Sequence, residues 1–142
     1  MSLDFSNPVR IVDAIRYASN YSDKTFSHVM RVAAIVAENR IIPVDLMDDC
    51  ISLAIMHDLL EDTDCKPSDL PENFGRALNL LTKQDGVSYE DYCKNIKDAC
   101  ISNYGRCAYW VKLADIKDHL SLTDTLTDKL KEKYLNGLRY LL

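Results

Sequence analysis

Two histidines and two aspartates occupy positions in this chain where apolar side chains are expected. His57 and Asp58 lie in segment 51–60, which is apolar and has helical periodicity, and His28 and Asp115 lie in two other stretches of the same kind. A buried imidazole or carboxylate is unfavourable unless it is hydrogen-bonded, paired or bound to a metal ion. Imidazole nitrogen and carboxylate oxygen are ligands that suit Mn²⁺, Fe²⁺ or Zn²⁺. The four residues together therefore predict a metal site.

Each residue also has a simpler interpretation when it is taken alone. A single His28 on an apolar face is more often a core histidine that bonds a backbone carbonyl. A single Asp115 could form a buried salt bridge with Lys112, three residues earlier in the same helix. The convergence of two imidazoles and two carboxylates from three helices favours the metal site over these alternatives.

The four residues lie within three short motifs. Segment 28–33 reads HVMRVA, segment 57–63 reads HDLLEDT and segment 111–115 reads VKLAD. These resemble the HPxxVA, HDxxEDT and VKLAD motifs of the HD superfamily of metal-dependent phosphohydrolases. Within it they are most similar to the hydrolase domain of RelA/SpoT-type alarmone enzymes and the metazoan SpoT homologues. Val29 replaces the motif's proline, and the resemblance covers about residues 10 to 122.

This resemblance implies an all-α HD-domain fold and a bound Mn²⁺ ion, with Fe²⁺ or Zn²⁺ as alternatives. The implied metal ligands are His28, His57, Asp58 and Asp115. It also implies that Glu61 and Asp62 are the catalytic acidic pair. Glu61 follows His57 by four residues, so on a continuous helix it could orient or deprotonate a metal-bound water. Asp62 could hold Glu61 or the ligands from outside, and the alternative for both is a solvated helix end.

Five residues are expected to contact the substrate: Lys24, Lys83, Lys112, His119 and Tyr89. An exposed surface position is the alternative for Lys83 and His119, and core packing is the alternative for Tyr89. The chain departs from the family in two places near these residues. The basic, glycine-containing stretch before the first histidine is short here, and His119 stands where the family has asparagine. Both departures lie in segments expected to contact the nucleotide.

These observations predict a metal-dependent phosphohydrolase with a small anionic nucleotide as substrate. The expected activity is that of a (p)ppGpp-type 3′-pyrophosphohydrolase or a close analogue. Two alternatives stay open. One is an HD-type 5′-nucleotidase that releases orthophosphate from nucleoside monophosphates, and the other is a metal- and nucleotide-binding sensor without turnover.

The elements that must position these residues are expected to be helices throughout one domain, residues 1–142. Four Gly and four Pro among 142 residues leave long stretches without helix breakers, and 47% of the residues are hydrophobic. We expect six to eight helices. Their expected ranges are Asn7-Pro8 to about 20, 22 to about 37, 43 to about 62, 72–82, 88–102, 106–122 and 127 to the C-terminus, with a break at 103–105.

Composition also limits location and partners. The net charge of −5 argues against binding to nucleic acid, and no apolar run reaches about 18 residues. The five cysteines, an odd number without a CxxC motif, are expected to be reduced and buried. We therefore expect a cytoplasmic protein without membrane contact. The apolar side of the last helix could cover the core or a second copy of the chain, so a homo-oligomer stays open.

Overall fold

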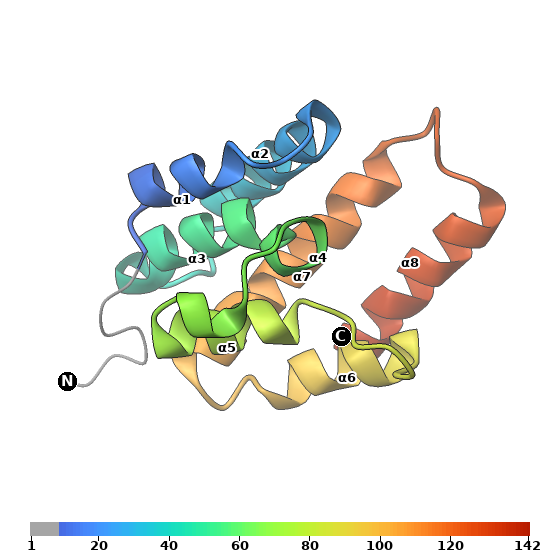
Figure 1. Cartoon of the computed structure of the whole chain (residues 1–142). Helices are drawn as coiled ribbons and strands as arrows, with labels where there is room; N and C mark the ends of the chain where they lie inside the picture. Colours follow the sequence, from blue (N-terminus) through green and yellow to red (C-terminus); the bar gives the residue numbers. More distant parts are fainter. Residues whose placement is uncertain (1–8) are drawn as a thin grey trace.

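The computed structural model describes residues 9–142 and is all-helical over that range, as predicted (Figure 1). The helix start predicted at Asn7-Pro8 lies outside the described residues. Seven helices have eight residues or more, within the expected six to eight, and there is no strand among residues 9–142. The helices are α1 (Ile11–Ala18), α2 (Asp23–Glu38), α3 (Val44–Met56), α5 (Glu72–Leu80), α6 (Tyr89–Asp98), α7 (Asn103–Ser121) and α8 (Asp128–Leu141), with single turns at α4 (Leu59–Asp62) and the 3₁₀ element η1 (Pro67–Asp69).

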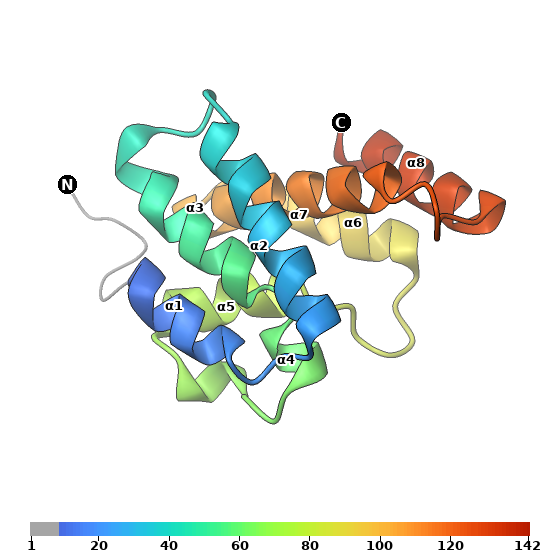
Figure 2. The ribbon, with the colours of Figure 1, turned by 90° about the horizontal axis from the view of Figure 1, so that it is seen from above.

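The long helix α7 is the centre of the arrangement. It contacts α2 and α3 on one side, α5 below them, and α6 and α8 on the other side (Figures 1 and 2). Its middle is buried, including Ala108, Val111 and Asp115. A polar residue in the middle of α7 is therefore presented to the interface between the two groups of helices.

Hydroxyl N-caps set the start of four of the helices. The cap residues are Ser22, Ser88, Ser102 and Thr127, and each accepts a hydrogen bond from the backbone N–H three residues later. The break predicted at 103–105 is wrong, because Ser102 caps α7 there. Gly105 packs so closely on the Ala99 carbonyl that an added Cβ would overlap its oxygen. The glycine therefore serves a close approach rather than a loop.

The helix predicted to run to residue 62 is interrupted at His57 and Asp58, where α3 ends before α4 begins. In a continuing helix the Ala54 carbonyl would accept the Asp58 N–H. Instead it accepts hydrogen bonds from the His57 ring at Nδ1, 2.6 Å away, and from the His57 backbone N–H, 3.4 Å away. Asp58 adopts φ −96° and ψ 3°. The His-Asp pair consequently lies at a bend, and Glu61 belongs to a separate turn.

The thiols of the five cysteines are all free, as expected. Cys50, Cys93 and Cys107 are buried, but Cys65 and Cys100 are only half-buried, so the prediction of five buried thiols is wrong for these two. Among residues 9–142, every helix is too short or too polar to cross a bilayer.

Candidate metal centre

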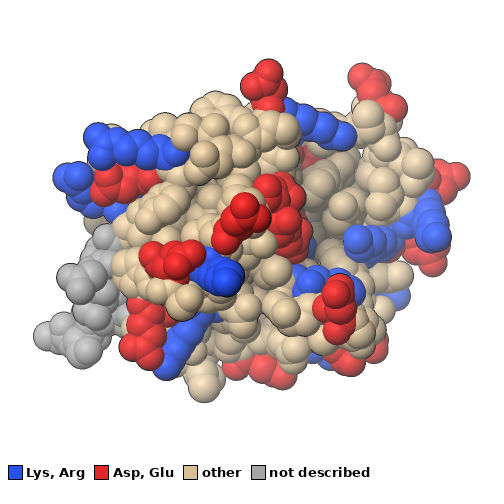
Figure 3. Space-filling view, in the orientation of Figure 1, with Lys and Arg blue, Asp and Glu red and all other residues tan. Residues whose placement is uncertain are grey.

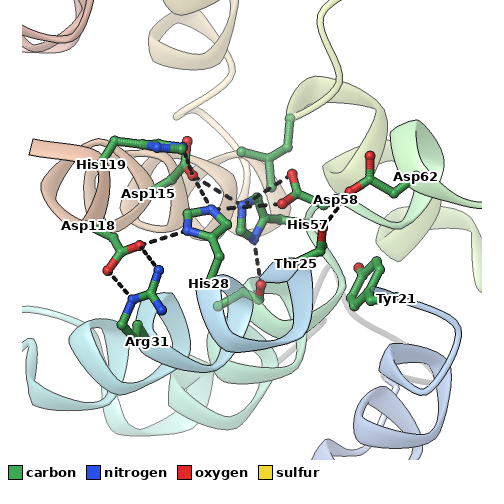
Figure 4. Close-up of polar contacts among 12 residues, drawn as sticks. Tyr21, Thr25, His28, Arg31, His57, Asp58, Asp62, Asp115, Asp118 and His119 are labelled. Atoms are coloured by element: carbon green, nitrogen blue, oxygen red, sulfur yellow. Dashed lines mark hydrogen bonds and ion pairs between the residues drawn. The ribbon is translucent and has the colours of Figure 1, made fainter. Parts of the chain in front are cut away.

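The four predicted ligands meet where α2, the bend after α3 and α7 come together (Figure 4). His28 Nε2 lies 2.8 Å from Asp115 Oδ1 and 3.8 Å from Asp58 Oδ2. His57 Nε2 lies 3.3 Å from Asp115 Oδ1 and 3.4 Å from Asp58 Oδ1. Ligand atoms of His28, His57 and Asp58 all lie within 4.8 Å of one another. Two nitrogens and two carboxylates thus face one small space.

The two oxygens of Asp115 have different partners. Oδ2 accepts from Lys112 Nζ at 2.9 Å, which is the ion pair considered above as the alternative to a metal site. Oδ1 lies near three imidazoles, because His119 Nε2 is 3.3 Å away in addition to His28 and His57. The ion pair therefore uses one oxygen and leaves the other facing the nitrogens. His28, Asp115 and His119 form a second group whose ligand atoms lie within 4.8 Å of one another.

Both histidines of the predicted ligand set are held through Nδ1, with Nε2 turned to the carboxylates. His57 Nδ1 donates to the Ala54 carbonyl, which can only accept, so this ring carries its proton on Nδ1. His28 Nδ1 lies 2.7 Å from Asp118 Oδ2. A carbonyl or carboxylate that holds one ring nitrogen so that the other faces the ion is the usual arrangement of metal-ligating histidines.

The electrostatics of the cluster favour a positive charge at Nε2. Burial alone would lower the pKa of His57, but Asp58 and then Asp115 raise it to about 9. Burial likewise opposes protonation of His28, and Asp115 and Asp118 outweigh it, so that its pKa is raised. Two lone pairs facing carboxylate oxygens at these distances need a proton or a metal ion between them. The donor set and its geometry therefore fit a divalent cation.

Asp118 and Arg31 complete the support of His28, and neither was predicted from the sequence. Asp118, 2% exposed, accepts from Arg31 Nε at 2.8 Å through Oδ1 and holds His28 through Oδ2. Burial would raise the pKa of Asp118, but Arg31 and His28 lower it. Each residue follows a predicted ligand by three positions, so the helical spacing that identified His28 and Asp115 also contained this signal.

Two cavities open beside the cluster. The first has a volume of about 360 Å³ and the second about 540 Å³. Asp58, Glu61, His119 and Tyr134 line both. The Tyr134 ring of α8 stacks on His119 with centroids 4.6 Å apart and planes 5° apart, so this pair forms part of the shared wall. The space-filling view shows a hollow here, with acidic atoms along one side and basic atoms towards α8 (Figure 3).

The structure places the predicted substrate contacts around these cavities. Lys83, Lys112 and Tyr89 line the first, Lys24 lines the second, and His119 lines both. The Lys112 ammonium also lies 5.7 Å from the Tyr89 ring centroid. That these residues contact a substrate stays a prediction.

The two predicted catalytic carboxylates differ in placement. Glu61 lines both cavities, and burial followed by the nearby charge of Asp58 raises its pKa, while the Lys83 backbone N–H opposes that shift. Asp62 lines only the second of the two and accepts from Thr25 Oγ1 at 3.4 Å. Burial, and next Asp58, also raises the pKa of Asp62. Glu61 is thus the carboxylate better placed beside the cluster.

Comparison of the chain with protein-family models and with curated proteins found no match. The chemistry of this centre is therefore the basis for inferring what the protein does.

Proposed function

We propose that the protein is a metal-dependent phosphohydrolase of the HD type that acts on a nucleotide, with a (p)ppGpp-like pyrophosphate ester as the leading substrate. The observation that carries the proposal is the convergence of His28 and His57 with Asp58 and Asp115, each histidine fixed through Nδ1. The cavity beside this cluster is lined by lysines and by Glu61, groups that suit an anionic substrate and an attacking water.

The four predicted ligands would hold one divalent ion. Such an ion lowers the pKa of a bound water and polarises a phosphoryl oxygen. Mn²⁺ is the ion implied by the motifs, while the donor atoms also suit Fe²⁺ and Zn²⁺.

We assign to Glu61 the role of accepting a proton from the attacking water. Its carboxylate faces the space beside the cluster, and its raised pKa makes it a better proton acceptor near neutral pH than an ordinary glutamate. His119 contributes a ring next to Asp115, where it can donate a hydrogen bond to a phosphoryl oxygen.

The test is a product analysis with purified protein, Mn²⁺ and a panel of ppGpp and nucleoside 5′-monophosphates. We expect pyrophosphate from ppGpp and a loss of at least 100-fold in kcat for Glu61→Gln. Glu38→Gln, an exposed glutamate at the end of α2, is the matched control and should leave kcat unchanged. Orthophosphate from the monophosphates would instead indicate a 5′-nucleotidase. Tight binding without product would indicate a sensor, and no turnover of the whole panel would refute the hydrolase.

A further inference from the structure

Three lysines from three separate elements line the first cavity. Lys83 comes from the loop between α5 and α6, Lys112 from α7 and Lys133 from α8. The same lining holds three carboxylates, so its fixed charges balance, whereas the chain as a whole carries a net charge of −5. Figure 3 shows the basic atoms at the rim of the hollow on the α8 side. This local enrichment in cations, relative to the rest of the chain, favours an anionic ligand.

The three ammonium groups are not equivalent. Lys112 is buried and its charge is balanced by Asp115 at 2.9 Å. Among residues 9–142, no carboxylate lies within ion-pairing distance of Lys83 or Lys133. Two positive charges at this wall are therefore free to bind an anion from solution.

Lys133 is also restrained at the cavity. Its Nζ lies 4.8 Å from the Tyr89 ring centroid and 5.5 Å from that of Tyr134, so aromatic faces support it on two sides. The absence of a side chain at Gly137 allows α8 to approach Tyr89, since an added Cβ would lie 2.9 Å from its hydroxyl oxygen. The helix is thus packed against the rim with Lys133 directed along it.

We propose that Lys83 and Lys133 bind a second anionic group of the substrate, of the phosphate class, beside the group held at the metal centre. The assignment of the first group rests on the proposed function. The substrate then carries at least two phosphate groups, as a pyrophosphate or a bisphosphate does. A monophosphate would leave both lysines without a partner and would bind more weakly.

Binding of inorganic probes tests the subsite without requiring turnover. The full-length protein with Mn²⁺ is titrated calorimetrically with pyrophosphate and, separately, with orthophosphate. For Lys133→Gln and for Lys83→Gln we expect about tenfold weaker pyrophosphate binding and a less than twofold change for orthophosphate. Lys133→Arg should restore pyrophosphate binding because it restores the charge. Lys129→Gln, on α8 but outside the cavity lining, is the matched control and should change neither affinity.

Equal losses of affinity for both probes, or no loss for either, would overturn the second subsite.

Turnover gives an independent test of the subsite. With a bisphosphorylated substrate, Lys133→Gln should raise KM about tenfold and leave kcat within twofold. If no substrate of the panel is hydrolysed but pyrophosphate binding still depends on Lys133, the proposed hydrolase fails and the subsite stands. If hydrolysis occurs but neither pyrophosphate affinity nor KM changes in Lys133→Gln, the hydrolase stands and the subsite is refuted.

Discussion

Replacement of Lys112 by methionine removes the ammonium group that pairs with Asp115 Oδ2. Both side chains are nearly inaccessible to solvent, and the ammonium donates to Oδ2 at 2.9 Å. Methionine keeps most of the stem volume of lysine, so the packing against α6 is disturbed little. The perturbation is therefore mainly a loss of charge next to a buried carboxylate.

The expected loss in the free energy of unfolding follows from this geometry. At 2.9 Å and an effective dielectric constant of about 20, the attraction is about 6 kcal/mol. Part of this attraction is offset because lysine is no longer desolvated, and because His28 and His57, whose pKa values are raised, still face the other oxygen of Asp115. The expected net loss in the free energy of unfolding is therefore about 3 kcal/mol, at the lower end of the range for a broken buried pair. A metal ion at the other oxygen of Asp115 would compensate part of that charge. We expect Lys112→Met to destabilise the protein by about 2 kcal/mol less in the presence of Mn²⁺ than in its absence. By linkage, the variant should then bind Mn²⁺ about 30-fold more tightly than the unchanged protein does.

Urea unfolding in EDTA and in excess Mn²⁺ measures both values, and calorimetry measures the metal affinity directly. Lys117→Met, at an exposed position of the same helix, should change the free energy of unfolding by less than about 0.5 kcal/mol in either condition. If Lys112→Met does not fold in EDTA, adding Asp115→Asn should recover folding, because it removes the unpaired charge. An equal destabilisation with and without metal would refute the placement of the ion beside Asp115.

Three further predictions concern stability. Mn²⁺ at 100 times its dissociation constant should raise the free energy of unfolding by about 2.7 kcal/mol and the thermal midpoint by about 8 °C, and a midpoint unchanged by metal would contradict the metal centre. Burial and neighbouring carboxylates raise the pKa of Asp49 to about 6. Because the folded protein then holds this proton more tightly than the unfolded chain does, the free energy of unfolding falls as the pH rises from about 4 through 6. Asp49→Asn should therefore stabilise by about 2 kcal/mol at pH 8 and little at pH 4, as measured by urea unfolding. Gly105→Ala should destabilise by about 3 kcal/mol or more through overlap with a carbonyl, whereas Gly86→Ala, at φ 82° in an open turn, should cost about 1 kcal/mol in the same unfolding assay.

The cluster was predictable because its members break an apolar helical pattern. His28 shares a helix face with Val32, and Asp115 shares one with Val111, and both of these valines are buried. The structure also buries most of the two polar side chains, which are 12% and 7% exposed. Periodicity therefore identified which side chains turn inward, and the motifs identified which of them belong together. The same rule applied three residues further along α7 would have included Asp118.

Two local features were not predictable by counting residues per turn. The bend at Asp58 depends on the His57 ring taking the Ala54 carbonyl, a side-chain bond that competes with the backbone bond of the helix. The start of α7 depends on Gly105 packing against a carbonyl from the preceding turn. In both cases a tertiary or side-chain contact determines where a helix begins or ends. Hydrophobic periodicity does not report such contacts, so it could not predict these boundaries.

The contribution of α8 was missed for a different reason. The sequence of α8 places Gly137 one turn after Lys133, on the same helix face. It does not show which face of α8 lies against the candidate metal centre. That choice depends on the packing of α8 against α6 and α7, which brings Lys133 over Tyr89. A lysine on an amphipathic helix has the sequence signature of a solvated residue whether or not it lines a cavity.

The charges around the cluster connect the proposed metal site with the proposed subsite on α8. The fixed charges at the cluster are those of Asp58, Glu61, Asp62, Asp115, Asp118, Arg31 and Lys112, with the two histidines neutral when they bind a metal ion. Five carboxylates against two cations leave three negative charges, of which one divalent ion offsets two. With the ion bound, the centre has no excess positive charge that would attract a polyanion by itself. The attraction must then come from Lys83 and Lys133, which lie outside this balance, so substrates with a second phosphate should depend on them most.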